Sequence, residues 1–168
     1  MRKFLRAIDS ISEWSGRICS FLVYIGIIML VFEVIARYFF SSPTVWAHGY
    51  SQRLFGSYFV LIGAYTLLKN GHVRIDILYQ RFSLRKRAFF DILNYIMLLI
   101  WTSVLLREGM SFFASSWAIR EADEMVLAHP VYPVKFLLVV GVVLITLQGV
   151  NHLIVSIFTL IKGVKYEY

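Results

Sequence analysis

Residues 18–40 read ICSFLVYIGIIMLVFEVIARYFF. An α-helix needs about 20 mainly apolar residues to cross the ~30 Å hydrocarbon core of a bilayer, so this stretch is long enough to span a membrane. Residues 46–68, 88–106 and 136–161 have the same apolar character. The sequence therefore predicts an all-α integral membrane protein with four transmembrane helices.

The composition agrees with this prediction. Of the 168 residues, 59% are hydrophobic and 16% are charged, whereas soluble domains average roughly 45–50% apolar and about 25% charged residues. Four spans and their connections use nearly the whole chain, so we expect residues 1–168 to form a single membrane domain. The basic N-terminus followed by an apolar run is also typical of a signal peptide. Because the run is long and lacks a clear small-residue cleavage site, we interpret it as a retained first span.

The basic residues are distributed unevenly among the connections. Four precede residue 18, six lie in residues 69–87 and two lie in the C-terminal tail, whereas residues 41–50 contain none. Residues 107–135 contain three basic and four acidic residues. The positive-inside rule therefore predicts that both termini and the 69–87 connection are cytoplasmic. The net charge of +7 is interpreted as an orientation signal and a contact with anionic lipids rather than with nucleic acid.

Two segments outside the spans are partly apolar. Residues 2–16 place apolar side chains near one helical face, which predicts a short amphipathic helix on the cytoplasmic surface. The 69–87 connection mixes apolar and basic residues, and we expect a second interfacial helix there. The basic residues expected to contact lipid headgroups in this connection are Arg81, Arg85, Lys86 and Arg87.

Three ionisable residues lie within the first two predicted spans, Glu33, Arg37 and Arg53. Such groups are costly in a bilayer unless they are paired or hydrated. Glu33 is seven residues from Phe40, and Arg53 is seven residues from Trp46, so both lie about 10 Å from the outer ends of their helices. We therefore predict a Glu33–Arg53 pair with Arg37 beside it. The alternatives are contact with a partner membrane protein and a role on an ion pathway.

The third and fourth predicted spans carry polar residues in their cytoplasmic halves. These residues are Asp91, Asn94, Gln148, Asn151 and His152. Hydrogen bonds between membrane helices fix helix register, so we interpret them as interhelical contacts, with a substrate site as the alternative. No catalytic site, cofactor or metal is expected, because the sequence has no suitably placed histidine pair, Cys/His cluster, phosphate-binding loop or nucleophile elbow.

Several short motifs, taken in order, resemble one known family. They are RYFFSSPTVW at residues 37–46, GAY at 63–65, GHVRID at 71–76, SW at 116–117, PVYPVK at 130–135 and LQG at 147–149. Over roughly residues 15–155 the chain resembles the small permease (DctQ-type, Q) subunit of tripartite ATP-independent periplasmic (TRAP) transporters. Members of this family often carry an acidic residue shortly after the loop tryptophan, where this chain has His48 and Gly49.

The resemblance implies a non-catalytic subunit of a secondary transporter in the bacterial inner membrane. In such systems a periplasmic protein captures a small organic anion, usually a carboxylate and sometimes a sulfonate. A large (M-type) membrane subunit then moves the anion inward with sodium. The small subunit is expected to scaffold the large one and to help dock the binding protein. The residues that select the anion are expected on the other subunits.

The resemblance and the charge pattern together nominate three groups of residues. Residues for intramembrane pairing or contact with the large subunit are Glu33, Arg37, Arg53, Trp46 and Gln148. The cytoplasmic-loop motif contributes His72, Arg74 and Asp76, and the acidic residues expected to meet the binding protein are Glu121, Asp123 and Glu124. Two alternatives remain open: a small transporter or channel that is self-sufficient as an oligomer, and a membrane anchor of a redox enzyme.

Overall fold

The computed structural model describes residues 2–69, 71, 82–124 and 127–164. Within these ranges the chain is helical, apart from connections that include an isolated antiparallel bridge between Ala122 and Pro130. The helices are α1 (Arg2–Tyr38), α2 (Ala47–Leu61), α3 (Gly63–Leu68), α5 (Leu84–Ala118) and α6 (Tyr132–Lys162). Among the described residues, three helices are long and apolar enough to cross a membrane, and they are α1, α5 and α6.

Helices α2 and α3 together cover the second predicted span. They are separated at Ile62, whose backbone is still right-handed helical (φ −75°, ψ −13°). The amide of Ile62 donates to the carbonyl of Tyr58 at 3.0 Å, and the amide of Thr66 donates to the carbonyl of Ile62 at 2.9 Å. The helical path therefore continues through a local distortion. Because each piece alone is shorter than a membrane crossing, the second predicted span stays a prediction, and with it the total of four spans.

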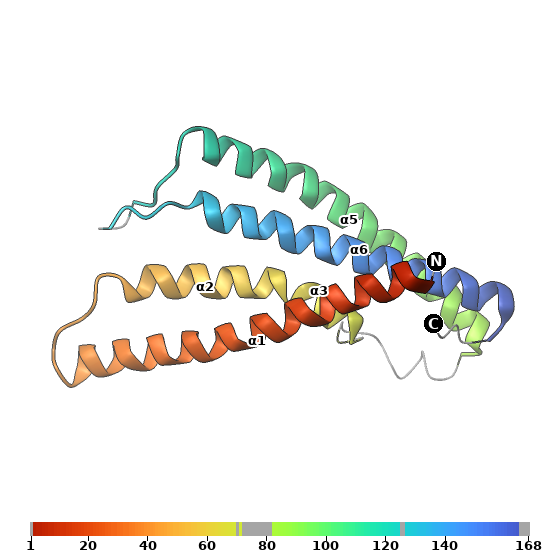
Figure 1. Cartoon of the computed structure of the whole chain (residues 1–168), viewed down its shortest axis with the longest axis horizontal. Helices are drawn as coiled ribbons and strands as arrows, with labels where there is room; N and C mark the ends of the chain where they lie inside the picture. The colour runs from red at the N-terminus through yellow and green to blue at the C-terminus, as the bar shows by residue number, and fades with distance from the viewer. Residues whose placement is uncertain (1, 70, 72–81, 125–126, 165–168) are drawn as a thin grey trace.

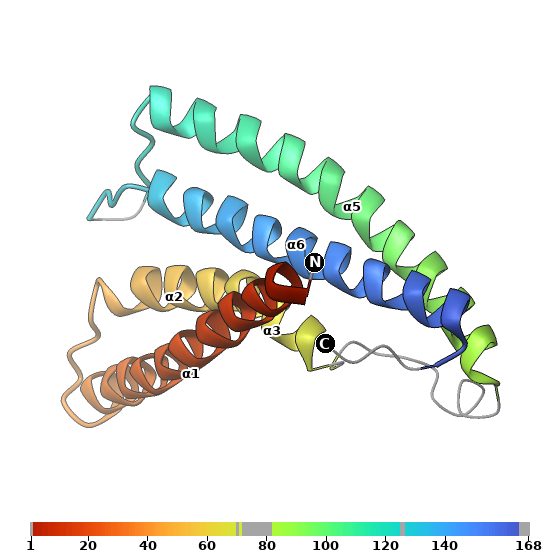
Figure 2. The same ribbon diagram turned by 45° about the vertical axis from the view of Figure 1, so that its right-hand side comes forward.

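The helices form a flat array. Across Figure 1 they lie in the order α5, α6, α2 with α3, and α1. Helix α6 packs on each of the other described helices, whereas α5 packs mainly on α6. The connections after α1 and α5 lie at one end of the array, here called the loop end. The start of α1 and the end of α6 lie toward the opposite end, here called the terminal end, where α1 crosses α6 (Figure 2).

Helices α5 and α6 pack as an antiparallel pair with a seven-residue period. The buried residues of α5 are Ala88, Tyr95, Thr102, Gly109 and Ser116. Those of α6 include Lys135, Val142, Gly149 and Ser156. A seven-residue repeat is typical of left-handed helix pairs, and small buried residues allow membrane helices to approach closely. This pair is the most extensive helix contact among the described elements.

Helix α1 is continuous over 37 residues, so the separate amphipathic helix predicted for residues 2–16 is wrong. Leu5, Ile8 and Ser12 are buried with helical spacing, and the same stripe continues through Gly16 and Cys19. Because one buried stripe runs through both halves, the first turns stay packed on the array and do not turn onto a membrane surface. At 1.5 Å per residue the helix is about 55 Å long, which exceeds the hydrocarbon core.

The interfacial helix predicted in the 69–87 connection falls mostly outside the described residues. This also applies to the motif residues His72, Arg74 and Asp76 and to Arg81. The basic residues Arg85, Lys86 and Arg87 belong to the first turn of α5, which begins at Leu84. Helix α5 therefore extends beyond the predicted span 88–106 at both ends.

Helix α6 approaches α2 very closely at Gly141. A Cβ atom on Gly141 would lie 2.5 Å from Cγ1 of Val60 and 2.9 Å from the carbonyl carbon and oxygen of Val60. Only a residue without a side chain permits this approach between backbones. The contact lies two residues before Ile62, so it anchors the distorted part of α2 and α3 against α6.

Replacing Gly141 with alanine is expected to destabilise the protein, because an overpacked methyl group typically costs about 1–3 kcal/mol. The melting temperature of the purified protein in detergent should fall. Gly56→Ala is the matched control, because a Cβ atom at Gly56 would meet nothing within 4 Å and alanine favours helix over glycine. An equal loss of stability in both variants would contradict the close α2–α6 packing.

Candidate functional site

The charged residues of the first two spans take partners that differ from those predicted. Glu33 accepts hydrogen bonds from the guanidinium of Arg37 at 2.5 and 3.0 Å, and from the amide of Thr44 at 3.1 Å and its hydroxyl. Arg53 on α2 pairs with Asp123 instead. The predicted Glu33–Arg53 pair is therefore wrong. Thr44 supplies two donors to Glu33, and the partner of Arg53 comes from a distant loop that local spacing does not reveal.

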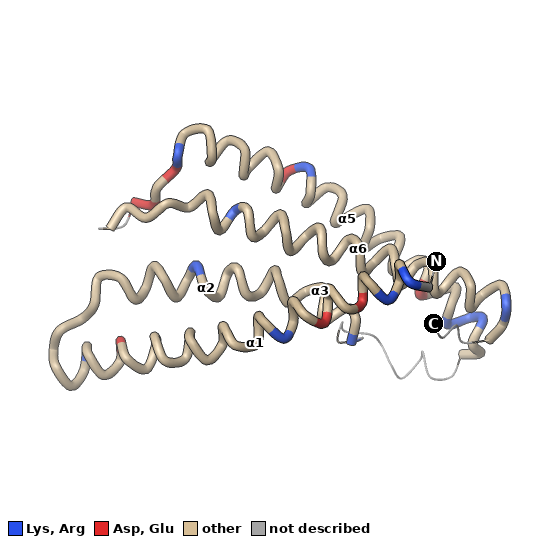
Figure 3. The backbone as a smooth tube through the Cα atoms, viewed as in Figure 1, with Lys and Arg blue, Asp and Glu red and all other residues tan. Residues whose placement is uncertain are grey.

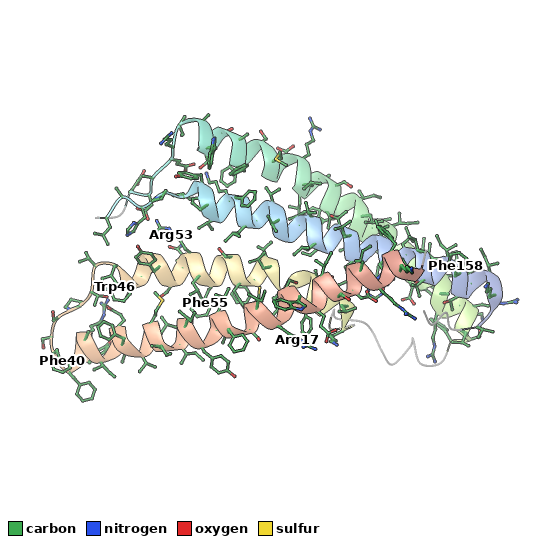
Figure 4. All side chains as sticks on the ribbon, in the orientation of Figure 1. Arg17, Phe40, Trp46, Arg53, Phe55 and Phe158 are labelled. Atoms are coloured by element: carbon green, nitrogen blue, oxygen red, sulfur yellow. The ribbon has the colours of Figure 1, made fainter. Side chains whose placement is uncertain are left out.

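Trp46 closes the connection between α1 and α2. Its ring stacks on Phe32 of α1 with centroids 5.9 Å apart, and its edge contacts Tyr50 at 6.2 Å. One turn further along α2, Phe55 lies against Gly26, where a Cβ atom would be 2.6 Å from the ring (Figure 4). These contacts hold the first hairpin together, so Trp46 has a structural role within this chain.

A group of charged side chains at the loop end joins the two hairpins. We call it the loop cluster, and it comprises Arg53, Glu121, Asp123, His129 and Lys135. Arg53 reaches from α2 toward the α5–α6 connection (Figure 4) and binds the Asp123 carboxylate, with the His129 carbonyl at 3.4 Å. The other Asp123 oxygen accepts the amide of His129 at 3.1 Å. Both charged side chains are largely buried, at 17% and 16% exposed. Asp123 therefore shapes its own loop and ties it to α2.

Lys135 forms the second ion pair of the loop cluster. It is 8% exposed, its ammonium contacts the Glu121 carboxylate, and it lies 3.6 Å from the centroid of the Phe112 ring. The Lys135 ammonium holds the pKa of Glu121 below its usual value, so this carboxylate is ionised at neutral pH. A buried cation with one carboxylate and an aromatic face is satisfied within the chain.

A second polar group joins α1 to α6 toward the terminal end. The side chain of Gln148 is fully buried, and its carbonyl accepts the hydroxyl of Ser12 at 2.8 Å. The amides of Gln148 and Asn151 donate to one oxygen of Asp9 at 3.0 and 2.6 Å. His152 extends this group of contacts to α5, because its ring stacks on the ring of Tyr95 with centroids 5.3 Å apart. We call these residues the helix-crossing cluster.

The interpretation of Gln148, Asn151 and His152 as interhelical contacts agrees with this geometry. Sequence reasoning missed their partners Asp9 and Ser12, because it assigned them to a surface helix. A signal was present: both residues lie at helical spacing from the buried Leu5 and Ile8. Of the three acidic loop residues, Glu121 and Asp123 pair within the chain, whereas Glu124 is exposed.

The fold and these two clusters define a multi-pass, all-helical membrane protein whose buried polar groups join helices. In the ranges described above, no group of three His, Cys, Asp or Glu residues could hold a metal ion. The family model described as "Tripartite ATP-independent periplasmic transporters, DctQ component" matches residues 26–159. The chain belongs to this family, the small permease component of TRAP transporters. No curated protein matches the chain significantly.

Membership in the family confirms the resemblance read from the short motifs. It also indicates the kinds of partner, because the family forms part of tripartite transporters that include a large permease and a binding protein. In that setting the loop cluster and the helix-crossing cluster are the parts of this chain that hold its two hairpins in a fixed relation.

A double-mutant cycle is expected to detect coupling between Arg53 and Asp123. Arg53→Gln and Asp123→Asn should each lower thermal stability in detergent, because each leaves a partly buried charge without its partner. The double variant should lose less than the sum, with a coupling of about 1–3 kcal/mol. The exposed pair Glu13–Arg17 is the control and should show negligible coupling. Additive losses for Arg53 and Asp123 would show that the loop is not held by this pair.

Proposed function

We propose that this chain is a non-catalytic scaffold for the large (M-type) permease of a TRAP transporter. In this role the chain stabilises the large subunit and helps dock a periplasmic substrate-binding protein. The complete transporter takes up a small organic anion, a carboxylate or a sulfonate, driven by sodium. The observation that carries the proposal is the flat array with apolar outer surfaces. Helix α1 buries only one stripe and α5 packs mainly on α6, so most of the surface of both edge helices is left for lipid or for a neighbouring subunit.

The internal pairing of the polar side chains supports a scaffold role. Asp9 and Gln148 bond to each other, and Arg53 and Asp123 do the same. These groups hold helices in register, as expected for a part that stays fixed while another subunit moves. Glu33, Arg37 and Trp46 likewise stabilise the first hairpin, so contact with the large subunit by these residues would add to a structural role.

The charge distribution supports a cytoplasmic terminal end. Figure 3 shows blue segments gathered there on α1, α5 and α6. In this orientation Arg85, Lys86 and Arg87 lie at the level of anionic headgroups, and the loop end faces the periplasm. The exposed Glu124 then offers negative charge to a binding protein, whereas the other two acidic residues of this connection are already paired within the chain. Such charge complementarity favours fast, salt-sensitive encounters.

Cysteine labelling tests the orientation. In a Cys19→Ser background, Ala122→Cys is expected to react with a membrane-impermeant maleimide added outside intact spheroplasts. Leu84→Cys should react only after the membrane is permeabilised, which makes the two sites controls for each other. The reverse pattern would overturn the assignment of both termini to the cytoplasm.

Reconstitution tests the scaffold function. We expect this chain to co-purify with the large permease, and we expect sodium-driven uptake in proteoliposomes only when both membrane chains and the binding protein are present. Omitting this chain should reduce uptake by at least about tenfold, because the large subunit loses its brace and part of its docking platform. Uptake by this chain alone would support a self-sufficient transporter and contradict the proposal.

A further inference from the structure

Helix α5 carries two neighbouring charges that the clusters described above do not use. The side chain of Arg107 is 87% exposed and that of Glu108 is 69% exposed, and they approach each other at 3.9 Å. Both residues lie well inside α5, which runs from Leu84 to Ala118, and Figure 3 shows a red and a blue segment side by side on this helix. An exposed pair of adjacent charges contributes little to the stability of the chain itself.

These charges lie at the level where the neighbouring helix α6 is wholly apolar. Gly109 of α5 packs near Leu138 of α6, and Leu99 of α5 packs near Gly149. Arg107 and Glu108 therefore lie level with the α6 segment between those contacts. Residues 138–145 of that segment, LVVGVVLI, contain no polar side chain. This level is inside the apolar span of α6 rather than beyond its end.

Packing contacts also show which residues of α1, at the opposite edge of the array, lie at the same depth as Arg107 and Glu108. Gly141 of α6 contacts Val60 of α2. Helix α1 passes the level of Val60 between its contact with α3 at Gly16 and its contact with α2 at Gly26. In this part of α1 the side chains of Phe21 and Tyr24 are exposed. One edge of the array is thus apolar at the depth where the other edge presents two charges. Charged side chains at such a depth normally face protein or water-filled space rather than lipid.

The two charges lie on either side of a strip of exposed residues on α5. Successive residues of an α-helix are about 100° apart, so Arg107 and Glu108 flank a strip centred on Val104, Ser111 and Ser115. These three residues are exposed, and the Ser115 hydroxyl folds back onto the carbonyl of Ser111 at 2.8 Å. The strip lies opposite the buried residues Thr102 and Gly109 on the side of α5 that packs on α6.

We propose that this strip of α5 binds a transmembrane helix of the large permease, with an acidic group of that helix opposite Arg107 and a basic or hydrogen-bond-donating group opposite Glu108. The inference rests on the proposed scaffold function and names the surface that performs it. We infer that a protein helix rather than lipid covers this strip, because a helix can provide complementary charges and lipid tails offer neither charge a partner. Nearer the terminal end the same side of α5 carries Met97 and Ile100, which suit lipid.

Photocrosslinking tests the position of this contact. In a Cys19→Ser background co-expressed with the large permease, a benzophenone maleimide is attached to Ser111→Cys or, as the control on the opposite edge, to Tyr24→Cys. We expect Ser111→Cys to crosslink to the large permease and Tyr24→Cys to do so far less. Crosslinks from Ser111→Cys only to lipid, or to a second copy of this chain, would overturn the inference. Co-purification of the unmodified pair, measured alongside, reports separately on the scaffold function.

Exchanging the charges tests the chemistry of the contact. The double variant Arg107→Glu/Glu108→Arg should reduce the co-purified large permease by about tenfold, because each charge then meets one of like sign. The exchange Glu13→Arg/Arg17→Glu on α1 involves another exposed pair, in which Glu13 also approaches Lys69 at 3.8 Å, and should leave the yield unchanged. The amount and melting temperature of the double variant alone, expected to match the parent, show that its fold is intact. Unchanged co-purification of the double variant would overturn the inference while leaving the scaffold function in place.

Discussion

The hydrogen bonds from Gln148 and Asn151 of α6 to Asp9 of α1 are the constraint on which the rest of the array depends. Between membrane helices the hydrophobic effect gives little driving force, so buried polar contacts and close packing decide register. Here one carboxylate oxygen receives both amides. It fixes where α1 crosses α6, and through the short first connection it also limits where α2 and α3 can lie.

The loop cluster supplies a second attachment, at the start of α6. Lys135 at the start of α6 holds Glu121, and Asp123 in the same connection binds Arg53 of α2. Between the two attachments, Gly141 lets the backbones of α6 and α2 touch. A helix held at its start and over the middle of its length cannot rotate or slide independently. The array therefore behaves as one piece although its helices do not surround a common core.

The sequence predicts the helices better than it predicts their partners. Apolar length is a local property, so three of the four spans are recovered as long helices, with ends that extend beyond the apolar runs where polar residues still continue the helix. Pairing is not local. The spacing of Glu33 and Arg53 along their own helices suggested a pair, but Asp123 lies 70 residues from Arg53. Asp9 was assigned to a surface helix because sequence periodicity does not show that α6 covers it.

The flat arrangement itself favours a role beside a larger protein. A closed bundle of four helices hides its polar residues in a central core and presents lipid-compatible side chains all round. A flat array has no such interior, so a charge on an edge helix is either paired with a neighbour in the chain or left on the surface. Asp9 of the edge helix α1 is paired in this way, whereas Arg107 and Glu108 of the other edge helix, α5, remain exposed. The edge that bears them is where the array is incomplete as a membrane protein on its own.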